Sequence, residues 1–145
     1  MKAPADRWAK APRGFTAMGI FLIFGALMAT LAGTTLVWPG TALDRIWSLN
    51  PRAYAELTPL GRVVGMAFIL FGMTLAVTAV GWFKRCLWGW RLAVGIIAAQ
   101  VLGDVVNVSR GRIVAGGIGA TIAGVMFFYL LGDAVRSAFG RHGPG

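Results

Sequence analysis

Reactive side chains are scarce in this chain, which has one cysteine, one histidine and five acidic residues among 145. The lone Cys86 excludes an intramolecular disulfide and a CxxC redox pair. His142 lies in a glycine-rich carboxyl-terminal segment, so no His/Cys cluster offers a metal or haem site. No phosphate-binding loop and no Ser/His/Asp set can be assembled. We therefore predict a protein that is not an enzyme and holds no metal or cofactor, although a groove for a bound lipid, quinone or pigment would need none of these residues.

Charge is scarce too, at 13% of the residues, whereas 57% are hydrophobic. An ordinary soluble domain carries about 25% charged residues. The apolar residues gather in four runs, at about 14–37, 61–83, 87–108 and 113–135. Each run is near the roughly 20 residues that a helix needs to cross a bilayer, and the alternation typical of a membrane barrel is absent. The sequence predicts an all-α integral membrane protein with four transmembrane helices.

The connections between these runs predict how the helices are joined. Residues 84–86 and 109–112 are short connections, so consecutive helices should be antiparallel neighbours in an up-down-up-down bundle. This gives a basic amino-terminal segment at 1–13, a membrane domain at 14–139 and a flexible tail at 140–145.

The longer connection, 38–60, carries helix signals. Thr41 and Asp44 suit a helix start, and Leu43, Ile46 and Trp47 share one face, which predicts a short interfacial helix over 41–49. Asn50-Pro51 can begin a second turn through Leu57, and Thr58-Pro59 suits the cap of the second span. The segment is either a linker folded back on the membrane or a docking surface.

The distribution of basic residues predicts the orientation. The net charge is +9, and the basic residues lie at the ends of the apolar runs, so we expect them to meet lipid headgroups and not nucleic acid. Nine fall on one side of the membrane: Lys2, Arg7, Lys10, Arg13, Lys84, Arg85, Arg91, Arg136 and Arg141. Five fall on the other: Arg45, Arg52, Arg62, Arg110 and Arg112. The positive-inside rule places both termini in the cytoplasm.

The tryptophans are expected near the membrane surfaces, because indole rings favour the headgroup level. Trp38 and Trp47 would mark the outer interface, and Trp8, Trp82, Trp88 and Trp90 the inner one. Frequent Arg, Gly and Ala suit a GC-rich bacterium, so the expected location is a bacterial inner membrane.

Small residues recur at every fourth position in each run. This spacing places them on one helix face, where they allow close packing of backbones. The predicted packing glycines are Gly25, Gly33, Gly61, Gly65, Gly72, Gly95, Gly103, Gly116 and Gly124. These stripes should build the core of the bundle, although any one of them could instead face a partner.

Polar residues within the third run form the one candidate site. Gln100, Asp104 and Asn107 are spaced by four and then three, so they share a helix face. In one interpretation, Asp104 forms a structural clasp with Arg62, Arg110 or Arg112 near the outer ends of the helices. In the other, it is a proton or cation site. Asp133 is expected to pair with Arg136, three residues later.

In length and layout the chain resembles small four-helix bacterial inner-membrane proteins, the DoxX-type proteins among them. The resemblance covers the outline and no motif, so it implies no activity. Our first functional hypothesis is a non-catalytic accessory, assembly or interaction subunit of a larger membrane complex, bound to other subunits or to itself. The alternative is a small oligomeric transporter or channel that uses the Gln100, Asp104 and Asn107 face. An intramembrane enzyme comes third.

Overall fold

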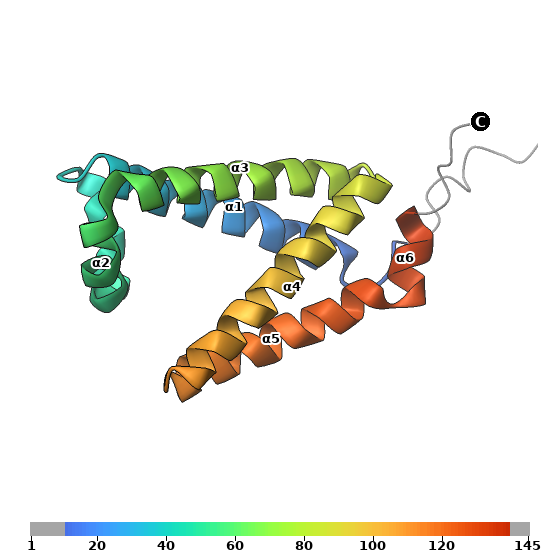
Figure 1. Ribbon diagram of the computed structural model, residues 1–145. Coiled ribbons are helices and arrows are strands. Elements are labelled where there is room, and N and C mark those ends of the chain that lie inside the picture. Colours follow the sequence, from blue (N-terminus) through green and yellow to red (C-terminus); the bar gives the residue numbers. More distant parts are fainter. Residues whose placement is uncertain (1–10, 140–145) are drawn as a thin grey trace, which may run out of the picture. The chain divides into compact units, whose positions relative to one another are not determined.

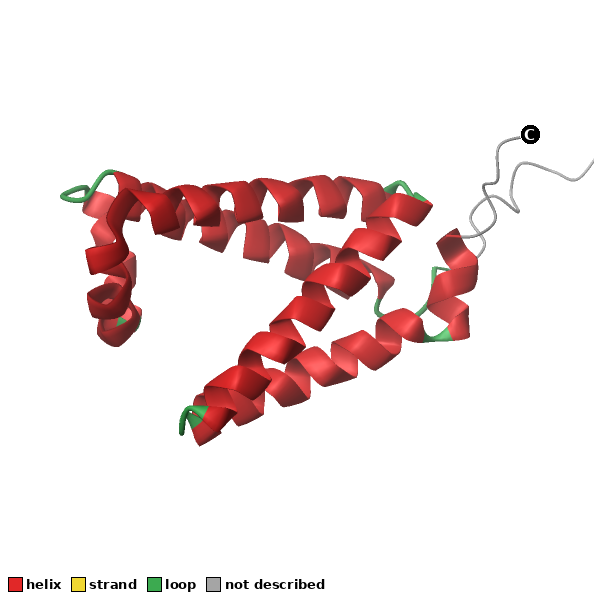
Figure 2. Cartoon of the chain, in the orientation of Figure 1, coloured by secondary structure: helices red, strands yellow, loops and turns green. Residues whose placement is uncertain are grey.

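The computed structural model describes residues 11–139, and 88% of these are helical, with no strand among them (Figure 2). The prediction of an all-helical chain is confirmed. Most of the basic amino-terminal segment, with Trp8, and the tail at 140–145 with His142 lie outside the described residues.

Eight helical elements follow one another along the described chain (Figure 1). They are α1 (Phe15–Val37), the 3-10 helix η2 (Ala42–Leu49), α2 (Pro51–Leu57), the 3-10 helix η3 (Thr58–Leu60), α3 (Gly61–Phe83), α4 (Leu87–Ser109), α5 (Ile113–Leu131) and α6 (Asp133–Phe139). Three helical segments are long and apolar enough to cross a membrane, and the count rises to four when α5 and α6 are taken as one bent span. The chain therefore has the helices of a membrane protein.

The helix predicted over 113–135 is interrupted, which corrects our expectation for the fourth run. Gly132 has an extended backbone (φ −61°, ψ 140°), and α6 turns away from α5 by 58°. Glycine is a poor helix former because it has the most backbone freedom to lose. The indole N–H of Trp90 donates to the carbonyl of Leu130 at 2.9 Å, so part of the hydrogen bonding lost at the break is replaced. Asp133 lies in the first turn of α6, where a carboxylate favours the positive end of the helix dipole.

The chain divides into two compact units, one formed by Gly19–Ala79 (unit 2) and the other by the residues before and after it (unit 1). In unit 2, α1 and α3 lie side by side (Figure 1). A Cβ on Gly33 would lie 2.6 Å from the carbonyl oxygen of Gly65, and one on Gly65 would lie 2.7 Å from Val37. Farther along, Gly72 packs on Thr30 and Gly25 faces Leu75, so the two helices are antiparallel.

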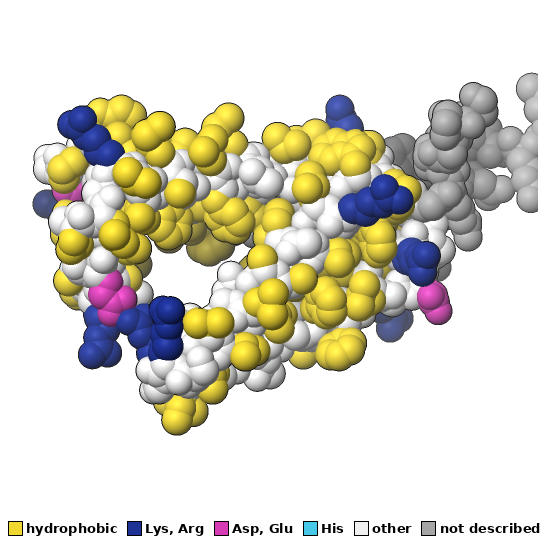
Figure 3. Space-filling model, viewed as in Figure 1, with side chains coloured by type: hydrophobic (Ala, Val, Ile, Leu, Met, Phe, Trp, Pro, Cys, Tyr) yellow, Lys and Arg dark blue, Asp and Glu magenta, His cyan; other side chains and the backbone are white. Residues whose placement is uncertain are grey.

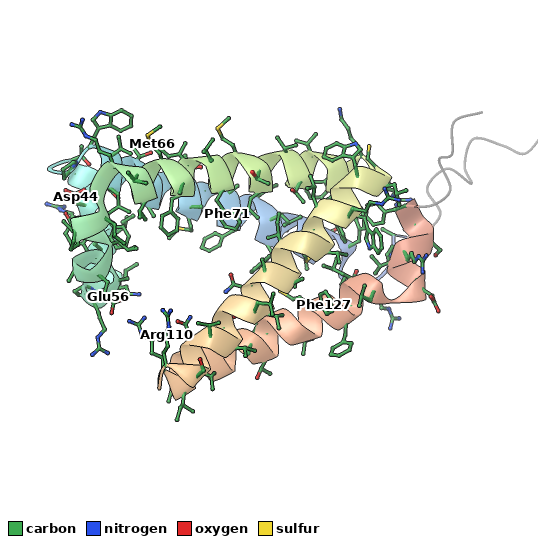
Figure 4. All side chains as sticks on the ribbon, in the orientation of Figure 1. Asp44, Glu56, Met66, Phe71, Arg110 and Phe127 are labelled. Atoms are coloured by element: carbon green, nitrogen blue, oxygen red, sulfur yellow. The ribbon has the colours of Figure 1, made fainter. Side chains whose placement is uncertain are left out.

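The connection between α1 and α3 is folded, but its details differ from the prediction. Asp44 accepts a hydrogen bond from the backbone N–H of Gly40 at 2.7 Å, whereas Thr41 makes no side-chain cap. The Trp47 indole donates to the Thr35 hydroxyl at 2.9 Å and thereby ties η2 to α1. Figure 4 labels Asp44 and Glu56 in this connection. Its position at a membrane interface stays a prediction.

The start of α3 is also organised differently from our expectation for Thr58. The Asn50 side chain caps α2 by accepting from the N–H of Ala53, as the sequence suggests. The Thr58 hydroxyl, however, donates to the carbonyl of Tyr54 at 2.6 Å, so Thr58 ends α2 and does not cap the second span. That span begins at Gly61, whose φ of +52° suits glycine.

In unit 1, α4 and α5 form an antiparallel hairpin (Figure 1). The turn between them is a Schellman motif: Arg112 N–H donates to Asn107 O, Gly111 N–H donates to Val108 O, both at 3.0 Å, and Gly111 has φ +84°. Close packing recurs where α3 meets α4, since a Cβ on Gly89 would contact the backbone of Gly81. The sequence pattern had not singled out these two glycines.

Trp82 lies in the core of unit 1 and not at a surface, which differs from the prediction. Its side chain is fully buried, stacks on Phe15 with ring centroids 5.0 Å apart, and donates its indole N–H to the Phe15 carbonyl at 2.8 Å. Phe139 from α6 packs on both rings. Trp38 and Trp88, by contrast, are exposed, at 59% and 45%.

Four of the predicted packing glycines have open space around them. Apart from its chain neighbours and its own helix backbone, a Cβ on Gly61, Gly95, Gly103 or Gly124 would meet no described atom within 4 Å. On α4, the buried residues Gly89, Ala93, Ile97 and Asp104 form one face, and Gly95, Ala99 and Gly103 lie on another, exposed face. The contacts within the chain thus use the face containing Gly89, and not the stripe of small residues formed by Gly95, Ala99 and Gly103.

Candidate functional site

The Asp104 side chain lies in the contact between α4 and α5. It is only 6% exposed, although α4 is largely exposed elsewhere. The facing residues of α5 are glycines: a Cβ on Gly119 would lie 2.7 Å from the carboxylate oxygen Oδ1, and one on Gly116 would lie 2.8 Å from the Asp104 carbonyl oxygen. The missing side chains of α5 therefore create the space that the carboxylate fills.

Gln100 is the polar partner of this carboxylate. Its amide Nε2 donates to Asp104 Oδ2 at 3.1 Å, as the i,i+4 spacing predicts for neighbours on one face. Gln100 itself is exposed, so the pair extends from the surface of α4 to the buried contact with α5. Burying a carboxylate without hydrogen bonds is costly, and the amide offsets part of that cost.

The other members of the predicted site are distributed along the chain. Asn107 is half-buried, and its backbone carbonyl belongs to the turn after α4. Arg110 is exposed at the end of α4, where Figure 4 labels it, and Arg112 directly precedes α5. Arg62 belongs to unit 2. The structure thus brings Gln100 and Asp104 together, while a clasp with the three arginines stays a prediction.

Hydrogen bonds from two tryptophans were not foreseen as structural links. Trp90 joins α4 to the end of α5, and Trp82 joins α3 to the start of α1. In each case the indole N–H donates to a backbone carbonyl and not to water or headgroups. Each hydrogen bond contributes about 1 kcal/mol to the stability of the fold. The position of these tryptophans near the ends of the spans was the only sequence feature that pointed to such links. The sequence does not show which carbonyl each indole contacts.

Among residues 11–139, no set of three or more His, Cys, Asp or Glu side chains is placed to hold a metal ion. Cys86 is a half-buried free thiol beside the α3–α4 turn. What the site offers chemically is one buried carboxylate with one amide donor.

Comparison of the chain with protein-family models, with curated proteins and with solved structures gave no match.

Proposed function

We propose that the chain is a small multi-pass protein of the bacterial cytoplasmic membrane, with four spans in up-down-up-down order and both termini in the cytoplasm. The apolar helices support membrane insertion, and the antiparallel pairs α1–α3 and α4–α5 support the alternating order. The excess of Lys and Arg on the side of the termini supports the orientation. Segment 41–49 would then lie at the outer interface.

We further propose that it acts as a non-catalytic accessory, assembly or interaction subunit of a larger membrane complex. The observation that carries this proposal is the open face of α4, which we define as Gly95, Ala99 and Gly103. These residues are exposed, and a Cβ on either glycine would meet no described atom within 4 Å apart from its chain neighbours and its own helix backbone. Only 17% of the apolar stretch of α4 is buried, against 28% for α1 and for the segment that contains α3.

The packing within the chain indicates what such a face is suited to contact. Lipid tails are as apolar as leucine, so membrane helices associate through close packing and not through a hydrophobic driving force. Glycines lie at several close helix contacts of the described chain, as at Gly33, Gly65 and Gly89. The open face of α4 offers the same kind of surface, and a transmembrane helix of another protein would pack there.

Purification of the native protein in a mild detergent tests this proposal. We expect a second membrane protein to copurify in a fixed ratio with the wild type and to be lost from Gly103→Leu, which fills the open face. The matched control is Gly117→Leu on α5, where a Cβ also meets open space. A wild type that purifies alone, or a partner retained by Gly103→Leu, would contradict the proposal.

The alternative is an oligomeric transporter or channel for a proton or cation. One observation favours it: Gln100 is exposed and hydrogen-bonded to the buried Asp104, which provides a polar route from the helix surface to a carboxylate. Ion flux into vesicles containing only the purified chain, abolished by Asp104→Asn, would establish this function in place of the first.

A further inference from the structure

Arg85 occupies a backbone conformation that favours glycine. The turn after α3 is a Schellman motif in which Cys86 N–H donates to Gly81 O and Arg85 N–H donates to Trp82 O, both at 2.9 Å. Arg85 has φ +55° and is the one residue other than glycine with positive φ in the described chain. The turn after α4 has the same hydrogen bonds with Gly111 in this place. An L side chain here costs free energy that glycine avoids.

The guanidinium of Arg85 lies over an aromatic cluster, which we define as Phe15, Trp82, Phe83 and Phe139. Its Cζ atom is 5.4 Å from the centre of the Phe15 ring, a cation–π distance. Phe15 is held by its stacking on Trp82 and by the edge contact with Phe83, whose ring centroid is 6.3 Å away. A guanidinium carries five N–H donors in a planar fork, and such a fork matches the oxygens of a phosphate group.

Further cations accompany this cluster in the sequence. Arg13 precedes Phe15 by two residues, Lys84 follows Phe83, and Arg136 precedes Phe139 by three. All three are exposed, and Arg91 is exposed in the first turns of α4. This end of unit 1 comprises the start of α1, the turn between α3 and α4, and α6. Asp133 is the one acidic residue among its described residues. Figure 3 shows several Lys and Arg side chains on the visible face of this end, beside one acidic side chain.

Apolar side chains border the same turn. Phe83, Leu87 and Trp88 are 44%, 41% and 45% exposed. A ligand that suits this surface has an anionic group for the cations and a hydrocarbon part for the neighbouring apolar side chains. A free phosphate ion has only the first of these features.

We propose that this end of unit 1 binds an anionic phospholipid, with the headgroup phosphate at Arg85 and flanked by Arg13, Lys84 and Arg136. Guanidinium groups bind phosphate oxygens through charge-assisted hydrogen bonds. The αL conformation of Arg85 and its contact with Phe15 place the guanidinium in advance of binding. This inference depends on insertion in a membrane but not on the accessory role, so the two can fail separately.

Native mass spectrometry of the full chain, delipidated in a neutral detergent, provides the test. We expect dioleoylphosphatidylglycerol to bind more tightly than dioleoylphosphatidylcholine. Arg85→Gly should weaken phosphatidylglycerol binding about fivefold, since one basic residue near an anionic surface contributes about that factor. Its thermal midpoint should be unchanged or higher, because glycine suits this turn. Arg110→Gln, at the other end of α4, should bind both lipids as the wild type does.

A double variant and a competition with inorganic phosphate test the same proposal independently of Arg85→Gly. The double variant Lys84→Gln/Arg136→Gln leaves the aromatic cluster intact and should also weaken phosphatidylglycerol binding, even if Arg85→Gly does not fold. Inorganic phosphate in excess should not displace the lipid. Equal binding of the two lipids, unchanged binding by the double variant, or displacement by inorganic phosphate would each overturn the proposal.

Discussion

The buried position of the Asp104 side chain requires a glycine at residue 119 of the facing helix. The carboxylate of Asp104 has room in the α4–α5 contact because residue 119 has no side chain, and Gln100 supplies a hydrogen bond from the same helix. The close approach of the Asp104 carboxylate to Gly119 leaves no room for a side chain at residue 119. The arrangement favours a structural role for Asp104.

Gly119→Ala should destabilise unit 1 by about 1–3 kcal/mol, because the new Cβ would lie 2.7 Å from the carboxylate of Asp104 and force a shift. Gly117→Ala, two residues away, is the matched control. A Cβ there meets open space, so this variant should be neutral or gain up to about 1 kcal/mol from helix propensity. Unfolding in detergent measures both. Equal effects of the two substitutions would show that the carboxylate is not packed against residue 119.

Asp104→Asn should lower stability by about 1 kcal/mol, because the Gln100 amide can still donate to the asparagine oxygen but the bond is no longer charge-assisted. Association with a partner should fall only in proportion to the folded protein. Thermal unfolding and the yield of copurified partner provide the measurements. A well-folded, normally assembled variant whose biological function is lost would indicate that the ionisable group itself is needed.

At the scale of helices, the sequence determines the number and the extent of the apolar runs but not all the contacts between them. The predicted bounds of α1, α3 and α4 agree with the structure to within one residue, because apolar length is a direct property of sequence. The break at Gly132 was not predicted, because a single glycine is common inside unbroken membrane helices. The hydrogen bond from Trp90 to the Leu130 carbonyl beside the break joins residues far apart in the sequence, so the sequence alone does not reveal it.

The glycine stripes also show that the sequence does not determine which helix faces are in contact. Gly33 of α1 and both Gly65 and Gly72 of α3 lie at close helix contacts, whereas Gly95 and Gly103 are open and Gly81 and Gly89 were not anticipated. Spacing shows that α4 has a face of small residues, but only the arrangement of the neighbouring helices determines whether that face is used. The pairing of Gln100 with Asp104 was predictable, because it is local, while the facing glycines of α5 were not.

Gly65→Leu and Gly103→Leu should therefore differ, although the stripe pattern treats them alike. A Cβ at residue 65 already lies 2.7 Å from Val37, so a leucine should cost at least about 3 kcal/mol or prevent folding of unit 2. A leucine at residue 103 meets open space and should leave the unfolding of the purified chain unchanged. Unfolding in detergent separates the two outcomes. Loss of stability in Gly103→Leu would mean that the face is covered within this chain.

For the whole molecule, the orientation has a direct test. Both termini should be cytoplasmic, because nine basic residues fall on that side and five on the other. Compartment-specific reporters fused after Gly145 and inserted within residues 48–56 should give opposite signals. A carboxyl-terminal reporter that is active outside would reverse the assignment of both membrane faces.

Photocrosslinking in intact membranes tests most directly whether the open face of α4 binds another protein. A photoreactive amino acid is placed at Ala99 on the open face or at Val105, which is 53% exposed on a different face of α4. We predict that the Ala99 position forms an adduct with one other polypeptide of defined mass and that the Val105 position reacts with lipid alone. An Ala99 position that yields only lipid adducts, only crosslinks within the chain, or only dimers of the chain would contradict the role of this protein as a subunit of a larger complex.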